Sequence, residues 1–124
     1  MFSAIKKIRG KKAYAAGLVG EMLAIAWLSL KGYQFIGWRQ KTLFGEVDLV
    51  MLDPRAHCLV LVEVKNHQTL ERSQTAISFE QQRRLKAAAN VIAARVQKKY
   101  DNVRFDAVFC GGWAFPVHLK NAFF

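Results

Sequence analysis

The sequence predicts a single α/β domain in which helices flank a mixed β-sheet. A helical apolar stretch precedes three strand-like runs, and a second helical stretch leads into a further strand-like run. The chain has 124 residues, 52% hydrophobic, with two prolines, which suits one domain with a substantial core. We expect a basic arm over residues 1–12 and one domain over residues 13–124.

The chain is strongly basic. Nineteen Lys and Arg residues against nine Asp and Glu residues give a formal charge of +10. This charge favours a polyanionic partner, nucleic acid before a membrane surface. The basic arm either contacts phosphates or is a solvated terminus. Cys58 and Cys110 are too few and too far apart for a disulfide framework, which indicates buried free thiols in a reducing compartment.

The basic arm followed by an apolar run superficially resembles a signal peptide. Glu21 interrupts the run, no small-residue cleavage site follows it, and residues 18–30 are fewer than the ~20 that a membrane-spanning helix needs. We therefore expect a cytoplasmic protein without a membrane span.

Residues 14–31 carry apolar side chains at helical spacing and end before Gly32, so they predict a largely buried helix. Its one acid, Glu21, lies a single turn from Leu18 and Ile25 on the same side. Glu21 either points inward, which would suggest a site, or pairs at the periphery with a nearby lysine.

Three strands should follow as an antiparallel meander. Residues 33–39 are rich in aromatics and end at a Gln-Lys-Thr cluster, and residues 47–52 and 58–64 form two apolar runs joined by a Pro-containing break. If Asp53 pairs with Cys58, the residue numbers of facing pairs sum to 111. Asp48 then faces Glu63, and Glu46 faces Lys65.

Alternation along the strands puts these four charged side chains on one face. The other face would be apolar and suited to packing beneath a helix: Val47, Leu49, Met51, Val60, Val62 and Val64. Two carboxylates directly opposite each other are destabilising in a sheet. A divalent cation between Asp48 and Glu63 is the obvious remedy.

The second half of the chain adds a loop, a helix and a strand. Residues 66–76 are polar and predict a loop, and Ser78 with Gln81 forms a capping-box pattern for a helix over residues 79–99. A strand over residues 103–110 should join the sheet in parallel after this crossover helix, with a short strand near residues 115–119. The helix has a buried stripe and a basic outer surface: Leu85, Ala89, Ile92 and Val96 inside, and Arg83, Arg84, Lys86, Arg95, Lys98 and Lys99 outside.

An acid followed by Glu-x-Lys on the adjacent strand is the arrangement expected of a metal-dependent phosphodiesterase. Asp48 and Glu63 would supply carboxylates to Mg²⁺ or Mn²⁺, with the backbone carbonyl of Val64 as a third ligand. Lys65 would position a water or neutralise charge in the transition state. The structural alternative is a pair of cross-strand salt bridges, which leaves Asp48 opposite Glu63 unexplained.

These residues resemble the PD-(D/E)xK nuclease motif, whose superfamily shares an αβββαβ core. From about residue 17 onward the chain is similar to the YraN family, described as restriction-endonuclease-like and related to archaeal Holliday-junction resolvases. The resemblance implies an active-site set of Glu21, Asp48, Glu63 and Lys65 with Mg²⁺ as cofactor. The similar segments are Gly20-Glu21, Gly32-Tyr33, Gly45-Glu46-Val47-Asp48-Leu49-Val50, Val62-Glu63-Val64-Lys65, Arg84-Leu85, Phe105-Asp106-Ala107-Val108 and Asn121-Ala122-Phe123.

The chain departs from the family near the site. His67 stands where the family commonly has a basic residue, and Gln81 stands where it has a lysine. Glu46 matches the family's acid, which either binds metal or holds Lys65. We take Gln81 as a further candidate for the catalytic set. The candidate contacts to nucleic acid are Arg39, Lys41, His67, Arg83 and Arg84.

The leading hypothesis is a metal-dependent endonuclease that hydrolyses DNA phosphodiester bonds. Branched or junction DNA enters as a substrate only by analogy with the resolvases. A homodimer would suit a two-fold-symmetric junction, although no interface is evident in the sequence. The alternative is a nucleic-acid-binding protein of nuclease fold with little or no catalytic activity, and a third reading is a basic partner protein without a nucleic-acid role.

Overall fold

The computed structural model describes residues 17–65, 79–110 and 115–122. The predicted basic arm, the predicted loop over residues 66–76, Ser78 and His67 lie outside these residues. The described elements begin with a helix over residues 17–30, called here the 17–30 helix. It is followed by β1 (Gln34–Thr42), β2 (Gly45–Asp53), β3 (Cys58–Lys65), α3 (Phe79–Arg95), β4 (Asn102–Phe109) and β5 (Val117–Leu119).

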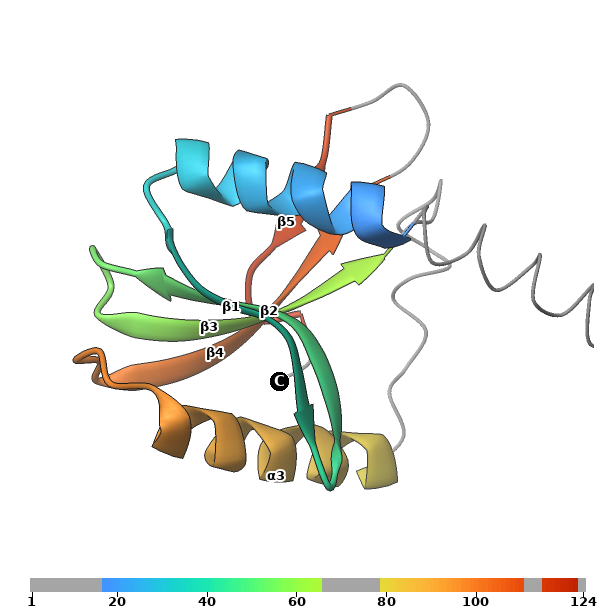
Figure 1. Cartoon of the computed structure of the whole chain (residues 1–124), viewed down its shortest axis with the longest axis vertical. Helices are drawn as coiled ribbons and strands as arrows, with labels where there is room; N and C mark the ends of the chain where they lie inside the picture. Colours follow the sequence, from blue (N-terminus) through green and yellow to red (C-terminus); the bar gives the residue numbers. More distant parts are fainter. Residues whose placement is uncertain (1–16, 66–78, 111–114, 123–124) are drawn as a thin grey trace, which may run out of the picture.

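The strands form a five-stranded sheet in the order β1-β2-β3-β4-β5. The β3–β4 pair is parallel and the other three pairs are antiparallel. Figure 1 shows the 17–30 helix over one face of the sheet and α3 over the other. The predicted mixed α/β sheet flanked by helices is therefore confirmed, and it is compatible with a restriction-endonuclease-like core.

The 17–30 helix packs on the sheet through one face only. Ala24 and Leu28 are fully buried, whereas Met22 is 57% exposed and Leu30 is 83% exposed. The expectation of a largely buried helix was wrong, because only one side of this helix meets the sheet. Its C-terminus is closed as predicted, with Gly32 at a φ of +95° and the N–H of Tyr33 donating to the carbonyl of Leu28 at 3.1 Å. No described helix is long and apolar enough to cross a membrane.

The second helix, α3, buries the predicted stripe. Ala89 and Ile92 are buried, and Leu85 and Val96 pack against the same cluster. The helix stops at Arg95, so the predicted end at residue 99 was wrong. The N–H of Val96 donates to the Ala93 carbonyl at 3.3 Å, and the hydroxyl of Tyr100 donates to the same carbonyl at 2.8 Å. These two bonds satisfy a carbonyl that a longer helix would have used.

The strands lie close to their predicted positions. β1 runs to Thr42, so the Gln-Lys-Thr cluster is strand rather than boundary. The predicted facing pairs hold from Asp53–Cys58 to Leu49–Val62, and β4 is parallel to β3 as expected. Leu49, Met51, Val60, Val62 and Val64 belong to the cluster that includes Ala24 and Leu28 of the 17–30 helix.

Two predictions about apolar side chains have different outcomes. Val47 packs in the cluster that includes Ala89 and Ile92 of α3, so it does not share a face with Leu49 and Met51 as the alternation had predicted. Cys58 and Cys110 are free and buried as predicted, and burial raises the pKa of both thiols. Both faces of the sheet are thus mainly apolar, although Asp106 of β4 is fully buried.

Candidate active site

β2 and β3 separate beyond the Leu49–Val62 pair, and we call this point the fork. Past the fork, β2 continues with β1 through Gln40–Val47 and Lys41–Glu46. β3 continues with β4 as far as Lys65–Phe109. The predicted facing pairs Asp48–Glu63 and Glu46–Lys65 are therefore not ladder pairs, because each strand stays with its outer neighbour. Arg39, which lies beside Asp48 on β1, has a φ of +48°, a local irregularity of the β1–β2 ribbon.

Asp48 lies at the fork and reaches across it. Its Oδ2 accepts a hydrogen bond of 2.8 Å from the backbone N–H of Val64. Desolvation by burial raises the pKa of Asp48 to about 6. The Val64 hydrogen bond lowers this pKa, while the charges of Glu63, Glu21 and Glu46 raise it further. The negative charges of three other carboxylates thus act on the Asp48 carboxylate at the fork.

Glu63 and Lys65 stand on the β3 side of the fork. Lys65 Nζ lies 3.1 Å from Glu63 Oε1, so Lys65 pairs with its neighbour on the same strand and not with Glu46. Glu46 instead faces Lys41 across β1 and β2. The Glu46–Lys65 salt bridge of the structural alternative is therefore not formed, and Lys65 pairs with Glu63 instead.

Val64 presents its backbone to the same gap. A strand residue directs its N–H and its C=O to the same edge. Since the Val64 N–H points at Asp48, its carbonyl points toward the β2 side as well, beyond the last β2–β3 ladder pair. This carbonyl is available to a ligand bound between the strands.

Glu21 points inward from the 17–30 helix. Only 6% of the residue is exposed. Its Oε2 accepts hydrogen bonds from Trp38 Nε1 at 2.6 Å and from Arg39 Nε at 3.0 Å. The alternative of a peripheral pair with a lysine is thus excluded. Arg39, predicted to contact nucleic acid, forms an ion pair with the acid of the first helix.

Three acids, Glu46, Asp48 and Glu63, line a small, partly open pocket of about 60 Å³, called here the acidic pocket. It is lined by Glu46, Val47, Asp48, Val62, Glu63, Leu85 and Phe105. Among the described residues, no three Asp, Glu, His or Cys side chains converge closely enough to hold a metal by themselves. Mg²⁺ needs only one or two carboxylates because it keeps several waters. Asp48, Glu63 and the Val64 carbonyl therefore fit this ion.

The remaining predicted residues are spread around the site. Lys41, Arg83 and Arg84 are exposed. Gln81 lies in the first turn of α3, and the direction of its side chain lies outside what the structure describes. The sequence reasoning missed Trp38, which donates to Glu21. An aromatic residue next to Arg39 on a strand was the available signal, although nothing local linked it to the first helix.

A second charged cluster, also missed, surrounds Asp106 of β4, which pairs with Val62 of β3 in the ladder. Asp106 is fully buried and accepts hydrogen bonds from Arg104 Nε at 2.8 Å and the Asn121 N–H at 3.2 Å, with His118 Nε2 at 2.7 Å. Arg104 also lies 3.6 Å from Asp53, at the opposite end of β2 from Asp48. A charged residue inside a strand-like run could have indicated Asp106, as it did Asp48.

The sheet order and the Asp48, Glu63-x-Lys65 arrangement define a class, the α/β proteins with a restriction-endonuclease-like core. Within this class the chain belongs to the uncharacterised protein family UPF0102, or YraN, whose family model matches residues 20–110. This confirms the resemblance seen in the sequence.

Curated relatives match over almost their whole lengths. The chain is 43% identical over 116 residues to UPF0102 protein mlr4633 of Mesorhizobium japonicum, covering 92% of this chain and 90% of the relative. It is 39% identical to a UPF0102 protein of Caulobacter sp. strain K31, covering 94% and 84%, respectively. It is 37% identical to a UPF0102 protein of Bartonella tribocorum, covering 100% and 94%.

Proposed function

We propose that the protein is a metal-dependent endonuclease that hydrolyses phosphodiester bonds in DNA. The observation that carries this proposal is the fork, where Asp48 from β2 and Glu63 from β3 line one pocket with Lys65 beside them. Asp48 is desolvated and lies in the field of the Glu63 carboxylate, so a cation between the two acids would be favourable. The formal charge of +10 favours a polyanion such as DNA as the substrate of this site.

Each side chain has a distinct role in this proposal. Asp48, Glu63 and the Val64 carbonyl would hold Mg²⁺ or Mn²⁺, which when bound polarises a phosphoryl oxygen and makes a water more acidic. Lys65 stands 3.1 Å from Glu63, where its ammonium group can orient the attacking water or offset charge on the phosphate in the transition state. Glu21 is fixed by Trp38 and Arg39, so it adds negative potential rather than a mobile ligand.

The substrate would be held by the exposed basic side chains. Arg83 and Arg84 lie on the solvent side of α3, and Leu85, next to them, lines the acidic pocket. DNA bound along α3 would therefore bring a phosphate to the acids. The family belongs to a superfamily that includes resolvases, which favours branched DNA as the substrate and a homodimer as the active form. Such a protein would act on DNA in the cytoplasm. Light scattering tests the dimer, and a monomer at high protein concentration would contradict the homodimer proposal.

Cleavage assays test the activity. Labelled linear, flapped and four-way DNA, and RNA, should be incubated with the purified protein and Mg²⁺, Mn²⁺ or a chelator. We expect cleavage of DNA that needs metal and is lost in Asp48→Asn and Lys65→Ala. Asp101→Asn is the matched control, because Asp101 is an exposed acid just before β4 and does not line the acidic pocket. Binding without cleavage would instead support a nucleic-acid-binding protein of nuclease fold.

Titration calorimetry tests the metal independently of activity. Mg²⁺ or Mn²⁺ should bind the wild-type protein, and Asp48→Asn should abolish this binding because the amide is neutral. The absence of binding in the wild type would contradict the proposed site.

A further inference from the structure

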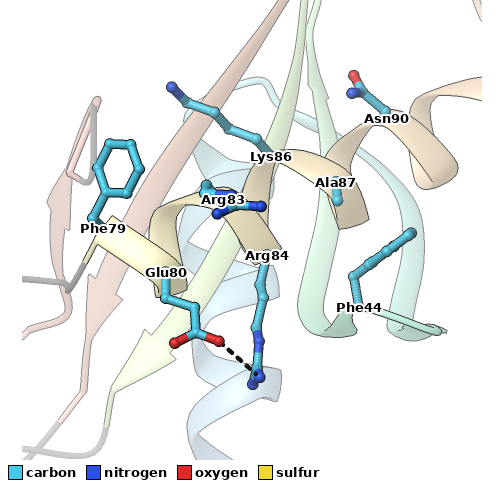
Figure 2. A pocket seen from close by; sticks show the side chains of 8 residues that line it. All are labelled: Phe44, Phe79, Glu80, Arg83, Arg84, Lys86, Ala87 and Asn90. Atoms are coloured by element: carbon cyan, nitrogen blue, oxygen red, sulfur yellow. Dashed lines mark hydrogen bonds and ion pairs between the residues drawn. The ribbon is translucent and has the colours of Figure 1, made fainter.

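An open pocket of about 590 Å³ lies on the outer side of α3, beside the acidic pocket, and we call it the basic pocket. The side chains that matter here are those of Phe44, Phe79, Glu80, Arg83, Arg84 and Lys86. Figure 2 shows Phe79 and Phe44 on opposite sides of Arg83, with Phe44 contributed by the β1–β2 turn and the other side chains by α3.

The two aromatic rings are exposed. Phe44 is 47% exposed and Phe79 is 77% exposed. Within the described part of the chain, neither ring stacks on another aromatic ring. Isolated exposed apolar side chains are common, but two phenylalanines in one pocket with three cationic side chains are a more specific arrangement. They form a surface that can accept a flat ring and an anion together.

The charges around the rings favour an anionic ligand. Arg83, Arg84 and Lys86 supply three positive charges against the single carboxylate of Glu80, a net charge of +2. Glu80 Oε1 lies 3.3 Å from Arg84 Nη2, so its negative charge is partly offset within the pocket. Alternating aromatic and cationic side chains are the usual construction of surfaces that bind single-stranded nucleic acid.

Phe44 is held in place by its turn. The hydroxyl oxygen of Thr42 accepts the N–H groups of Phe44 and Gly45, both at 3.1 Å, and donates to the Gly45 carbonyl at 2.7 Å. Gly45 has a φ of +147°, a conformation that favours glycine. The backbone that carries the ring is therefore ordered by the turn, so little backbone entropy is lost when a base stacks on Phe44.

The basic pocket is adjacent to the acids along two elements. Phe44 lies in the turn just before β2 and precedes Asp48 by four residues, which is at most ~13 Å of extended chain, or about the length of four stacked nucleotides. On α3, Leu85 lines the acidic pocket while its sequence neighbours Arg84 and Lys86 line the basic pocket. One strand of nucleic acid can therefore occupy both.

We propose that the basic pocket binds an unpaired DNA strand, with one base stacked on Phe44, another on Phe79, and its phosphates against Arg83. This inference rests on the proposed function and makes single-stranded or strand-separated DNA its substrate class. A duplex would not use the rings, because its bases are already stacked and it presents phosphates and base edges to a protein. An unpaired strand offers both ring faces and phosphates.

Fluorescence anisotropy with labelled oligothymidine, in chelator so that no cleavage occurs, tests the proposal. Phe44→Ala and Phe79→Ala should each weaken binding about tenfold, as expected for the loss of one base stack, whereas Phe44→Trp should retain it. The matched control is Leu43→Ala, because Leu43 is fully exposed in the same turn and does not line the pocket. Binding of a blunt duplex should not change in Phe44→Ala.

Salt dependence tests the role of Arg83. Arg83→Gln should reduce the slope of log affinity against log salt by about 0.7, the value for one phosphate contact on a single strand. Wild-type affinity for oligothymidine in both phenylalanine variants would overturn the proposal, as would equal weakening of duplex binding or tighter binding of oligouridine. If the wild-type protein binds single strands through its rings but does not cleave DNA, the result counts against the nuclease function alone.

Discussion

The carboxylate of Asp48 accepts the backbone N–H of Val64 at 2.8 Å, across the point where β2 and β3 separate. The Asp48 side chain here replaces the backbone carbonyl of a neighbouring strand as the acceptor for the Val64 N–H. The bond satisfies the Val64 amide and fixes the direction of Asp48, but it does not offset the desolvation of the charged carboxylate.

Replacement of Asp48 by asparagine should stabilise the metal-free protein at neutral pH. Burial raises the pKa of Asp48 from 3.8 to about 6, so the folded state binds more protons than the unfolded state between these values. The contribution of Asp48 to stability is therefore greatest below about pH 4 and falls as the pH rises through about 6. Asp48→Asn should gain on the order of 2 kcal/mol at neutral pH in urea denaturation.

The amide oxygen of asparagine can still accept the Val64 N–H, so the variant removes the charge and keeps the bond. Glu80→Gln serves as the control, because Glu80 is exposed and should change little. If Asp48→Asn is less stable than the wild type at neutral pH in the presence of chelator, the charged Asp48 carboxylate does not destabilise the folded protein.

Loss of Arg39 should destabilise the protein through Glu21. The Arg39 Nε to Glu21 Oε2 distance is 3.0 Å, and the two side chains are only 21% and 8% exposed. In Arg39→Met the buried Glu21 loses its ion-pair partner, which costs about 3 kcal/mol when one member of a buried pair is removed.

The double variant Glu21→Gln/Arg39→Met should lose less than the sum of the single variants, because no buried charge is left unpaired. Chemical denaturation of all four proteins gives the coupling free energy. Strictly additive losses would mean that the pair does not hold the 17–30 helix to β1.

The Asp106 cluster should respond to pH with the opposite sign to Asp48. Burial opposes ionisation of Asp106, but hydrogen bonds from His118 and Arg104 outweigh it and hold its pKa below the usual value. Its stabilising contribution is therefore present above about pH 4 and is lost as the pH falls. Asp106→Asn should cost roughly 3 kcal/mol at neutral pH, measured by urea denaturation.

Asp101→Asn is the matched control for that variant, because Asp101 is an exposed acid just before β4. Metal binding by the folded Asp106→Asn protein should be retained, since the cluster is tied to the opposite end of β2 from Asp48. Equal stability of Asp106→Asn and the wild type would contradict a structural role for the cluster.

The local pattern predicted the fold well because alternation and helical spacing report burial directly. It gave the hairpin register from Asp53–Cys58 to Leu49–Val62 and the parallel addition of β4. It failed past the fork, where the choice between two neighbouring strands is a tertiary one. The same limit explains Arg39, whose pairing with Glu21 depends on how the first helix lies on the sheet.

For the candidate site, the sequence supplied Asp48, Glu63 and Lys65 but not their arrangement. Charged residues in apolar strands are visible in sequence, whereas the pairing of Lys65 with Glu63 of its own strand instead of with Glu46 follows from the end of the described β2–β3 ladder at Leu49–Val62. Phe44 and Phe79 were missed because an isolated phenylalanine gives no indication of exposure. Their common pocket is formed only when the β1–β2 turn meets α3.

The fork also determines what controls the spacing of the two acids. Asp48 belongs to the β1–β2 ribbon and Glu63 to the β3–β4 pair, so their separation depends on the angle between two pieces of sheet. A small rotation of one piece about the Leu49–Val62 pair would change that separation and would act on the hydrogen bond from Val64 to Asp48, which joins the two pieces at the fork. Substitutions that alter the twist of the β1–β2 ribbon, remote from either carboxylate, could therefore shift the preference of the site between ions of different radius.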